Sequence, residues 1–149
     1  MASHVHSCLY YHFVWTTKNR LPFIKKDIKI ILYNFIGSLI ESRNWHLLAI
    51  GGSIDHIHIL IKKSSKYEIS DVACKIKSYS SKFIREKFNE NFSWQKGYAV
   101  FTIDKFSLKK IKNYINNQEI RHSKQSFEEE YESLLYFYEC EFEEDGLVK

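Results

Sequence analysis

The chain has 149 residues and a formal net charge of +4, and its composition is 44% hydrophobic and 16% aromatic. This length is typical of one domain with its own core, and the hydrophobic content excludes a disordered chain. No apolar run is long enough to span a bilayer, the N-terminal segment lacks a signal-peptide pattern, and three widely spaced cysteines argue against a disulfide framework, so we expect a cytoplasmic protein.

The first half of the chain alternates between strand and helix patterns. Residues 8–20, CLYYHFVWTTKNR, alternate aromatic and β-branched side chains and predict a strand. After Pro22, apolar residues at helical spacing predict a helix within residues 25–45. Residues 46–63 contain two apolar runs around Gly51-Gly52-Ser53, which predicts a β-hairpin.

The second half continues the pattern. Apolar residues from Ile69 to Ile84 predict a second amphipathic helix, and residues 92–103 predict a strand interrupted at Gly97. A third helix is expected over about residues 105–121, and a fourth after Ser126 as its N-cap. The order β-α-β-β-α-β-α-α predicts one ferredoxin-like α+β domain over residues 1–149. In that fold an antiparallel sheet has helices packed on one face, here with C-terminal helical additions and an acidic tail over about residues 128–149.

Two histidines stand one residue apart in the predicted hairpin, in the segment SIDHIHILIKK. Side chains two apart on a strand share a face, so His56 and His58 lie side by side, with Ile57, Ile59 and Ile61 on the opposite face. Neutral imidazole is the commonest protein ligand for divalent metals, and two imidazoles leave room for a third ligand. Alternatively, the two histidines are polar residues on the solvent face of a sheet.

The third predicted helix offers that ligand. Gln118 falls within the apolar stripe of Leu108, Ile111 and Ile115, where an amide without a partner costs roughly 1–3 kcal/mol. A metal held by the two histidines would be such a partner, and Tyr114, four residues earlier, would lie beside it. Alternatively, Gln118 bonds a backbone carbonyl and Tyr114 is a core aromatic.

A metal beside a tyrosine suggests phosphoryl chemistry. The phenol is a weak nucleophile at neutral pH, because its ordinary pKa is about 10. It attacks phosphorus usefully when a cation polarises the phosphodiester. With Mg²⁺ or Mn²⁺, phosphate oxygens and water could complete an octahedron, with Asp55 as an outer-shell acceptor.

These motifs resemble the single-tyrosine transposases of small bacterial insertion sequences, members of the HUH nuclease superfamily. The family is the insertion-sequence-200-like transposases, with REP-associated tyrosine transposases as relatives. DHIHIL matches its His-apolar-His motif and YINNQ its Tyr-x-x-x-Gln motif. YHFVWTTKNRLPF, FSWQKGYAVFTI and NQEIRHSKQSFEEEY match other family segments in order, so the likeness runs from about Tyr10 to about Tyr138. The chain departs where many members carry two adjacent histidines and it has Arg121-His122.

The resemblance implies a metal-dependent endonuclease and strand transferase that acts on single-stranded DNA with hairpins at the ends of a mobile element. Tyr114 would become linked to a 5′-phosphate, and His56, His58 and Gln118 would hold Mg²⁺ or Mn²⁺. Family members work as homodimers, often exchanging the tyrosine helix. The resemblance implies neither a nucleotide cofactor nor a membrane partner.

The charge distribution suggests a polyanionic partner. Residues 1–127 contain 21 Lys and Arg against 9 Asp and Glu, whereas residues 128–149 contain one lysine against nine acids. Lys75, Lys82 and Arg85 lie at helical spacing, and they either contact DNA phosphates or form a solvated helix face.

Three other functions are compatible with the sequence. The chain could be a domesticated relative that processes or binds palindromic repeat hairpins, or an inactive DNA-hairpin-binding regulator. A metal-dependent hydrolase of small phosphoesters is a third alternative, although it would need neither a covalent tyrosine nor a basic body.

Overall fold

A four-stranded antiparallel sheet forms the centre of the computed structural model, which describes residues 6–122 and 125–138. Its strands are β1 (Leu9–Thr16), β2 (His46–Gly52), β3 (His56–Lys63) and β4 (Ala99–Ile103). The strand order is β2-β3-β1-β4, that of the ferredoxin-like fold, which confirms the predicted α+β class. The two central strands pair in register from Leu9 opposite Lys63 to Thr16 opposite His56.

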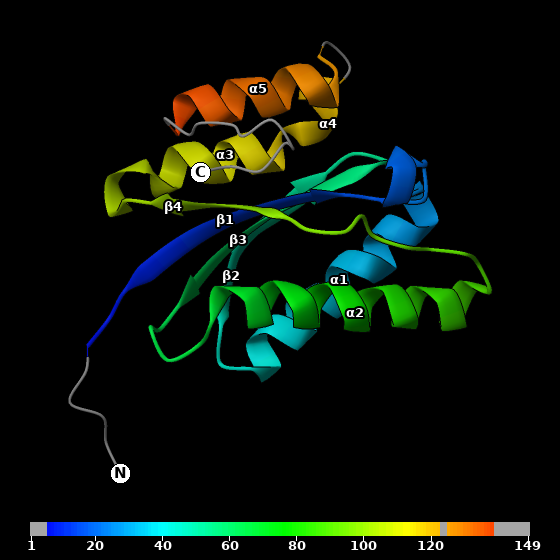
Figure 1. The fold of residues 1–149 in the computed structure, drawn as a ribbon, viewed down its shortest axis with the longest axis horizontal. Helices are drawn as coiled ribbons and strands as arrows, with labels where there is room; N and C mark the ends of the chain where they lie inside the picture. Colours follow the sequence, from blue (N-terminus) through cyan, green and yellow to red (C-terminus); the bar gives the residue numbers. More distant parts are fainter. Residues whose placement is uncertain (1–5, 123–124, 139–149) are drawn as a thin grey trace.

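One face of the sheet is covered by two long helices (Figure 1), α1 (Lys26–Ser42) and α2 (Ile69–Phe88). The main core lies between this face and the helices, and it contains Phe13, Trp15 and the isoleucines at 57, 59 and 61 of β3. The odd-numbered residues of β3 therefore point into this core, as the alternation predicts. None of the helices in the described ranges is both long and apolar enough to cross a membrane.

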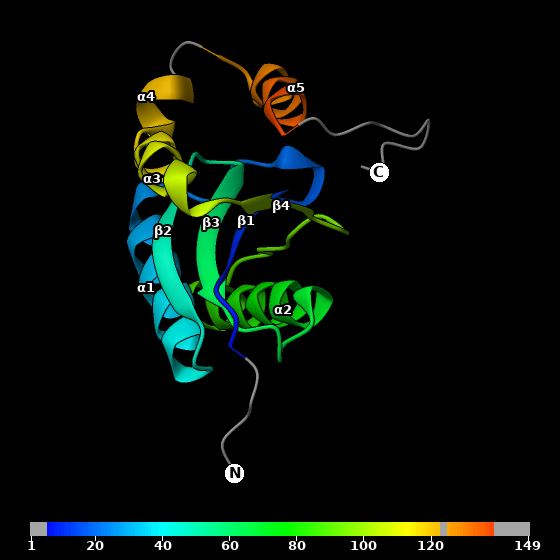
Figure 2. The ribbon, with the colours of Figure 1, turned by 90° about the vertical axis from the view of Figure 1, so that its left-hand side faces the viewer.

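The opposite face is covered by the C-terminal helical additions (Figure 2), which are α3 (Leu108–Asn116), α4 (Gln118–His122) and α5 (Phe127–Phe137). A cluster that includes Leu60, Ile111 and Ile115 fixes α3 over the sheet. A second cluster, which includes Val14 and Leu134, fixes α5. The even-numbered residues of β3 therefore point into the space beneath the C-terminal helices.

The predicted third helix is divided in the structure. A short 3₁₀ turn, η2 (Lys105–Ser107), precedes α3, and Asn117 separates α3 from α4 with φ −103° and ψ 19°. The Asn117 N–H still donates to Asn113 O at 3.1 Å, and the Arg121 N–H to Asn117 O at 3.0 Å. The bend therefore redirects the chain after Tyr114 while these two backbone hydrogen bonds are kept.

Two local predictions were correct, and one strand is shorter than predicted. Ser126 caps α5, accepting a hydrogen bond from the Glu129 N–H at 3.2 Å. Gly97 has φ +80° and bends the chain, as predicted. Residues before this bend make only an isolated bridge between Trp94 and Thr17, so the predicted strand over 92–103 is reduced to β4. A second short 3₁₀ turn, η1 (Lys18–Arg20), follows β1.

At Gly51 the backbone of β2 lies very close to that of α3. A Cβ atom at this position would overlap the backbone oxygen of Ile115, one residue after Tyr114. Only a glycine lets the helix that carries the tyrosine lie this close to the sheet.

We expect Gly51→Ala to lower the free energy of unfolding by about 1–3 kcal/mol, because the added methyl group must displace backbone and not a flexible side chain. Gly37→Ala is the matched control, since a Cβ there would meet only Leu47 Cδ2 at 3.5 Å within α1. That change should raise stability by about 0.5–1 kcal/mol through helix propensity. Urea unfolding of both variants measures the difference, and an unchanged midpoint for Gly51→Ala would contradict the close approach.

Candidate functional site

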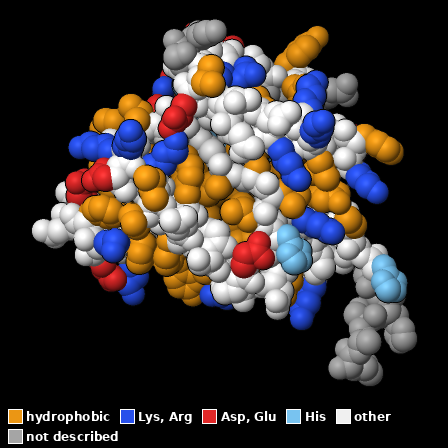
Figure 3. Space-filling model, turned by 180° about the vertical axis from the view of Figure 1, so that it is seen from behind, with side chains coloured by type: hydrophobic (Ala, Val, Ile, Leu, Met, Phe, Trp, Pro, Cys, Tyr) orange, Lys and Arg blue, Asp and Glu red, His pale blue; other side chains and the backbone are white. Residues whose placement is uncertain are grey.

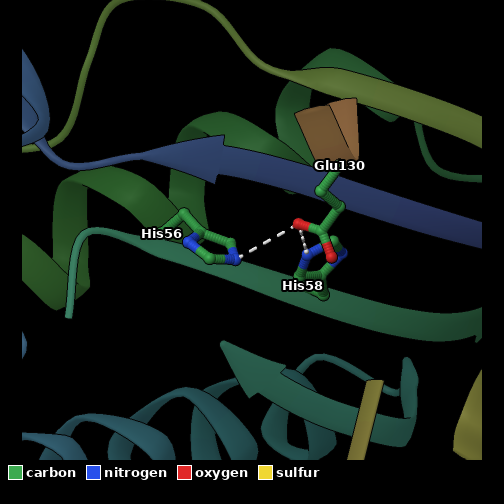
Figure 4. A group of neighbouring side chains, drawn as sticks. All are labelled: His56, His58 and Glu130. Carbon is green, nitrogen blue, oxygen red and sulfur yellow. Dashed lines mark hydrogen bonds and ion pairs between the residues drawn. The ribbon is translucent and has the colours of Figure 1, made fainter. Parts of the chain in front are cut away.

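His56 and His58 project from β3 into the space beneath α5 (Figure 4). Both side chains are 0% exposed, which excludes the alternative that they are polar residues on a solvent face. Buried imidazoles need partners for both ring nitrogens, so their contacts define what the site can do.

The Nδ1 atom of each histidine has a partner on the side of the ring away from Glu130. His56 Nδ1 lies 2.9 Å from Asp55 Oδ1, and His58 Nδ1 lies 2.8 Å from His12 Nε2. The other ring nitrogen of His12 lies 3.0 Å from the Tyr138 hydroxyl. Contacts of this kind fix the ring orientation of metal-binding histidines and leave Nε2 facing inward.

Gln118 and Tyr114, the other two residues predicted from the sequence, reach the same space. Gln118 is buried, and its Oε1 lies 3.0 Å from His56 Nε2 while its Nε2 donates to Glu130 Oε2 at 2.7 Å. The Tyr114 hydroxyl donates to that same Glu130 oxygen. The structure therefore brings together all four predicted side chains, around a fifth that the motif analysis did not identify.

That fifth residue, Glu130, comes from α5 and is 1% exposed. Its Oε1 lies 3.2 Å from His58 Nε2 and 3.4 Å from His56 Nε2. The ligand atoms of these three residues all lie within 4.8 Å of one another. The sequence does indicate that Glu130 is buried. It stands three residues after Phe127 and four before Leu134, and so lies within the apolar stripe of α5.

His12 is a second contributor that the motif analysis did not assign. It lies on β1 directly opposite Leu60, on the same face as His58, and it is fully buried. A histidine that alternates with apolar residues on a central strand is the signal that identifies it.

The surroundings of the Glu130 side chain keep its carboxylate ionised. Burial lowers the pKa of His58 to about 4, although Glu130 acts in the opposite direction. Burial also opposes protonation of His56, but its hydrogen bonds to Asp55 and Glu130 prevail and raise its pKa to about 9. The pKa of Glu130 is held well below its usual range despite burial, because both imidazoles contact it. Burial and the charge of Glu130 raise the pKa of Tyr114, so the phenol is held protonated here.

The donor set fits a divalent metal. Two imidazole nitrogens, a carboxylate oxygen and an amide oxygen converge, and both histidines are oriented by partners at Nδ1. These are ligand types that divalent transition ions and Mg²⁺ accept. Buried charged groups are ordinarily either paired or coordinated to a metal, and the Glu130 carboxylate is buried between the two imidazoles.

Tyr114 is reached from solvent through a groove of about 250 Å³ between α3 and α5. Lys110, Arg121 and Glu130 line the groove together with the tyrosine. The Arg121 guanidinium carbon lies 4.6 Å from the centre of the Tyr114 ring. Two basic side chains therefore flank the phenol on its open side, where a polyanion could approach.

The predicted DNA-binding residues Lys75, Lys82 and Arg85 lie on α2, on the other side of the sheet from the histidines. Arg85 lines a groove of about 560 Å³ that also contains Lys77, Trp94 and Tyr98. Lys75 and Lys82 do not line this groove. On the face shown in Figure 3, Lys and Arg side chains are spread around the rim and hydrophobic side chains lie between them.

A family model described as "Transposase IS200 like" matches residues 5–118. The chain is also 29% identical, over 116 residues, to the transposase for insertion sequence element IS200 of Salmonella typhimurium. The match covers 72% of this chain and 75% of the relative, and the Salmonella typhi protein matches equally.

Two solved structures share the fold. A putative transposase from Deinococcus radiodurans superposes with a TM-score of 0.65 and 22% identity, covering 79% of this chain and 96% of the other. A REP-associated tyrosine transposase bound to a REP hairpin gives a TM-score of 0.60 and 16% identity, covering 82% of this chain and 74% of the other.

Proposed function

This chain belongs to the IS200-like transposases, and from that premise we propose that it cuts and rejoins single-stranded DNA through Tyr114 with a divalent metal. The observation that carries the proposal is the convergence of Tyr114, Gln118 and the two histidines on a single carboxylate. These side chains come from α3, α4 and β3, so their meeting in one buried space is a product of the fold and not of local sequence.

His56, His58 and Gln118 would hold the metal, with Nε2, Nε2 and Oε1 as the donor atoms. A divalent metal bound there would polarise a phosphodiester and neutralise the charge that develops on it. Asp55 and His12 hold the two rings in place from outside, and Arg121 and Lys110 present positive charge along the approach to the phenol.

In the proposed reaction the Tyr114 oxygen attacks phosphorus and the bond from phosphorus to the 3′ oxygen breaks. The tyrosine becomes linked to the 5′-phosphate, and the departing oxygen takes up a proton in exchange for the one that the phenol loses. The 3′-hydroxyl of another strand later attacks the same phosphorus and releases the tyrosine.

The DNA partner in this proposal is single-stranded DNA with a hairpin, since a structural relative is described as bound to a REP hairpin. The α2 groove beside Arg85, where the exposed ring of Tyr98 can stack on a base, is the proposed surface for contacts away from the chemistry. We also propose that the active form is a homodimer, although every residue of the site described above comes from one chain.

The test is a denaturing gel of the full chain with labelled single-stranded DNA from its own flanking sequence, with Mn²⁺ or with EDTA. We expect a slow covalent protein–DNA band with Mn²⁺ and none with EDTA, because burial and the charge of Glu130 hold the phenol protonated and the proposed attack needs a metal to polarise the phosphodiester. Hairpin binding without a covalent band at any metal concentration would instead support the inactive regulator.

A further inference from the structure

A cavity of about 420 Å³ lies where the chain before β4 separates from β1. The ladder between these strands ends at Val14 opposite Ala99, and beyond it the chain makes only the bridge between Thr17 and Trp94. Residues 15–16 of β1 therefore face residues 95–98, and this segment bulges outward at the bend of Gly97. The volume of the resulting cavity is within the range of about 300–1,000 Å³ that is usual for small-ligand sites.

The walls of the cavity combine aromatic rings with basic side chains. Tyr98 lies in the bulged segment, and Tyr131 of α5 stacks with Phe127, one helical turn earlier, with ring centroids 5.7 Å apart. Arg20 and Lys96 bring positive charge to the same cavity. Aromatic rings beside cations are typical of sites that bind unpaired nucleobases, because every base has a face that can stack.

Two residues of the wall carry a buried N–H group that has no acceptor among the described residues. Of the four buried side-chain polar atoms in the described ranges that lack a hydrogen-bond partner, Trp15 Nε1 and Arg20 Nε belong to residues that line the cavity. The other two, on Tyr33 and Trp45, belong to residues that do not. Buried donors are ordinarily paired, and an exception calls for an explanation such as a ligand. A ligand that completes this wall must supply acceptors.

The cavity lies between the proposed strand-cleaving site and the α2 groove. The Phe127 ring in its wall is 4.7 Å from the His56 ring between centroids. Arg20 Nη2 lies 3.4 Å from Asp55 Oδ2, and the other oxygen of Asp55 contacts His56 Nδ1. Tyr98 lines both the cavity and the α2 groove. A strand that runs from the groove to the site can therefore place a base in the cavity.

We propose that this cavity binds one unpaired nucleobase of the single-stranded DNA, and that it prefers thymine or guanine to cytosine or adenine. The identity of the ligand as DNA rests on the proposed function. Thymine presents the acceptor O4 and guanine presents O6 and N7, whereas cytosine and adenine carry an amino group in place of the carbonyl oxygen. The N–H groups of Trp15 and Arg20 suit a carbonyl oxygen and cannot accept from an amino group. The cavity then contributes to the choice of the strand that is cut.

Binding of two labelled strands to the full chain without metal, followed by fluorescence anisotropy, tests this preference. The strands are oligothymidylate and oligodeoxycytidylate, each about ten nucleotides long, because both are flexible pyrimidine strands of equal charge. We expect oligothymidylate to bind at least about fivefold more tightly. Oligodeoxyuridylate, which keeps the carbonyl oxygen and lacks the methyl group of thymine, should bind like oligothymidylate.

Trp15→Phe removes one of the two donors and keeps an aromatic ring in the core. We expect the ratio of the two affinities to fall to within about twofold of unity, because the carbonyl oxygen loses a donor. Trp45→Phe is the matched control. Trp45 is also 1% exposed, lies in the same core and carries an N–H without an acceptor in the described part of the chain, but it does not line the cavity. Its substitution should leave the ratio unchanged.

Tyr131→Leu tests the aromatic wall. We expect both strands to bind at least about fivefold more weakly, because a stacking surface is lost. Tyr136→Leu is the control on the same helix, since Tyr136 is 88% exposed and does not line the cavity. Circular dichroism checks that each variant is folded. Should Trp15→Phe fail to fold, the comparison of Tyr131→Leu with Tyr136→Leu decides whether the cavity binds a base.

Three results would overturn the proposal: equal binding of the two strands, no binding of either, or a ratio that Trp15→Phe leaves unchanged. The adduct assay with Mn²⁺ separates this inference from the proposed function. A metal-dependent covalent band without a thymine preference would remove the base site and leave strand cleavage. A preference that depends on Trp15, without a covalent band on any strand, would keep the base site and remove strand cleavage.

Discussion

Tyr114→Phe should reduce formation of the covalent protein–DNA adduct by on the order of a thousandfold or more, because it removes the proposed nucleophilic oxygen. The ring that remains keeps its packing, including the Arg121 guanidinium above it and the His58 ring 5.5 Å away. The substitution removes the hydrogen bond from the hydroxyl to a Glu130 oxygen, and that oxygen still accepts from Gln118. The fold and the proposed DNA-binding surfaces should therefore be preserved.

Two measurements on the same protein samples check this result. Adduct is quantified on a denaturing gel with Mn²⁺, and binding of a labelled hairpin is followed by fluorescence anisotropy, where we expect a change of less than about threefold. Tyr136→Phe is the control, since Tyr136 is an 88% exposed tyrosine on α5 outside the site. Adduct formation by the phenylalanine variant would move the covalent link to another residue, and a parallel loss of hairpin binding would argue against a purely chemical role.

The pairing of the two histidines on one face of a strand could be predicted, because strand alternation is a local rule. The rule placed Ile57 and Ile59 in the main core and His56 and His58 on the opposite face, as the structure has them. Local periodicity also predicted that Gln118 needs a buried polar partner, and the structure provides such partners in His56 and Glu130.

The contribution of Glu130 could not be predicted in the same way. The cap at Ser126 and the apolar stripe located α5 in the sequence, but they do not say which face of the sheet the helix covers. That choice is made by packing between residues far apart in the chain, such as Val14 with Leu134. An acid within an apolar stripe signals a buried polar partner, and only the tertiary arrangement shows that Glu130 contacts His58, Gln118 and Tyr114.

The break at Asn117 has a similar origin. Asparagine is a weak helix former, which permits a bend but does not require one. The bend occurs where α3 is held to β2 by the close approach at Gly51 and where Gln118 has to turn toward His56. The position of the tyrosine relative to the histidines thus depends on a backbone contact that cannot be predicted from composition and periodicity.

His56→Ala should abolish the metal-dependent step, lowering adduct formation by at least about a hundredfold at every Mn²⁺ concentration. One imidazole nitrogen of His56 faces Gln118 and Glu130, and the other faces Asp55. The substitution therefore removes a proposed metal ligand together with its hydrogen bond to Asp55. In the unaltered chain, EDTA should suppress the adduct and added Mn²⁺ should restore it. In the variant, added Mn²⁺ should restore little.

The variant also leaves buried polar groups without a partner, at a cost of roughly 1–3 kcal/mol each, so its thermal unfolding must be measured at the temperature of the cleavage assay. His46→Ala provides the control for loss of an imidazole, because His46 is exposed on β2 and takes no part in the site. If the folded His56→Ala protein cleaves DNA as fast as the His46→Ala protein, His56 is not a ligand. The reaction would then have to draw its positive charge from Arg121 and Lys110, the two cations that line the groove to Tyr114.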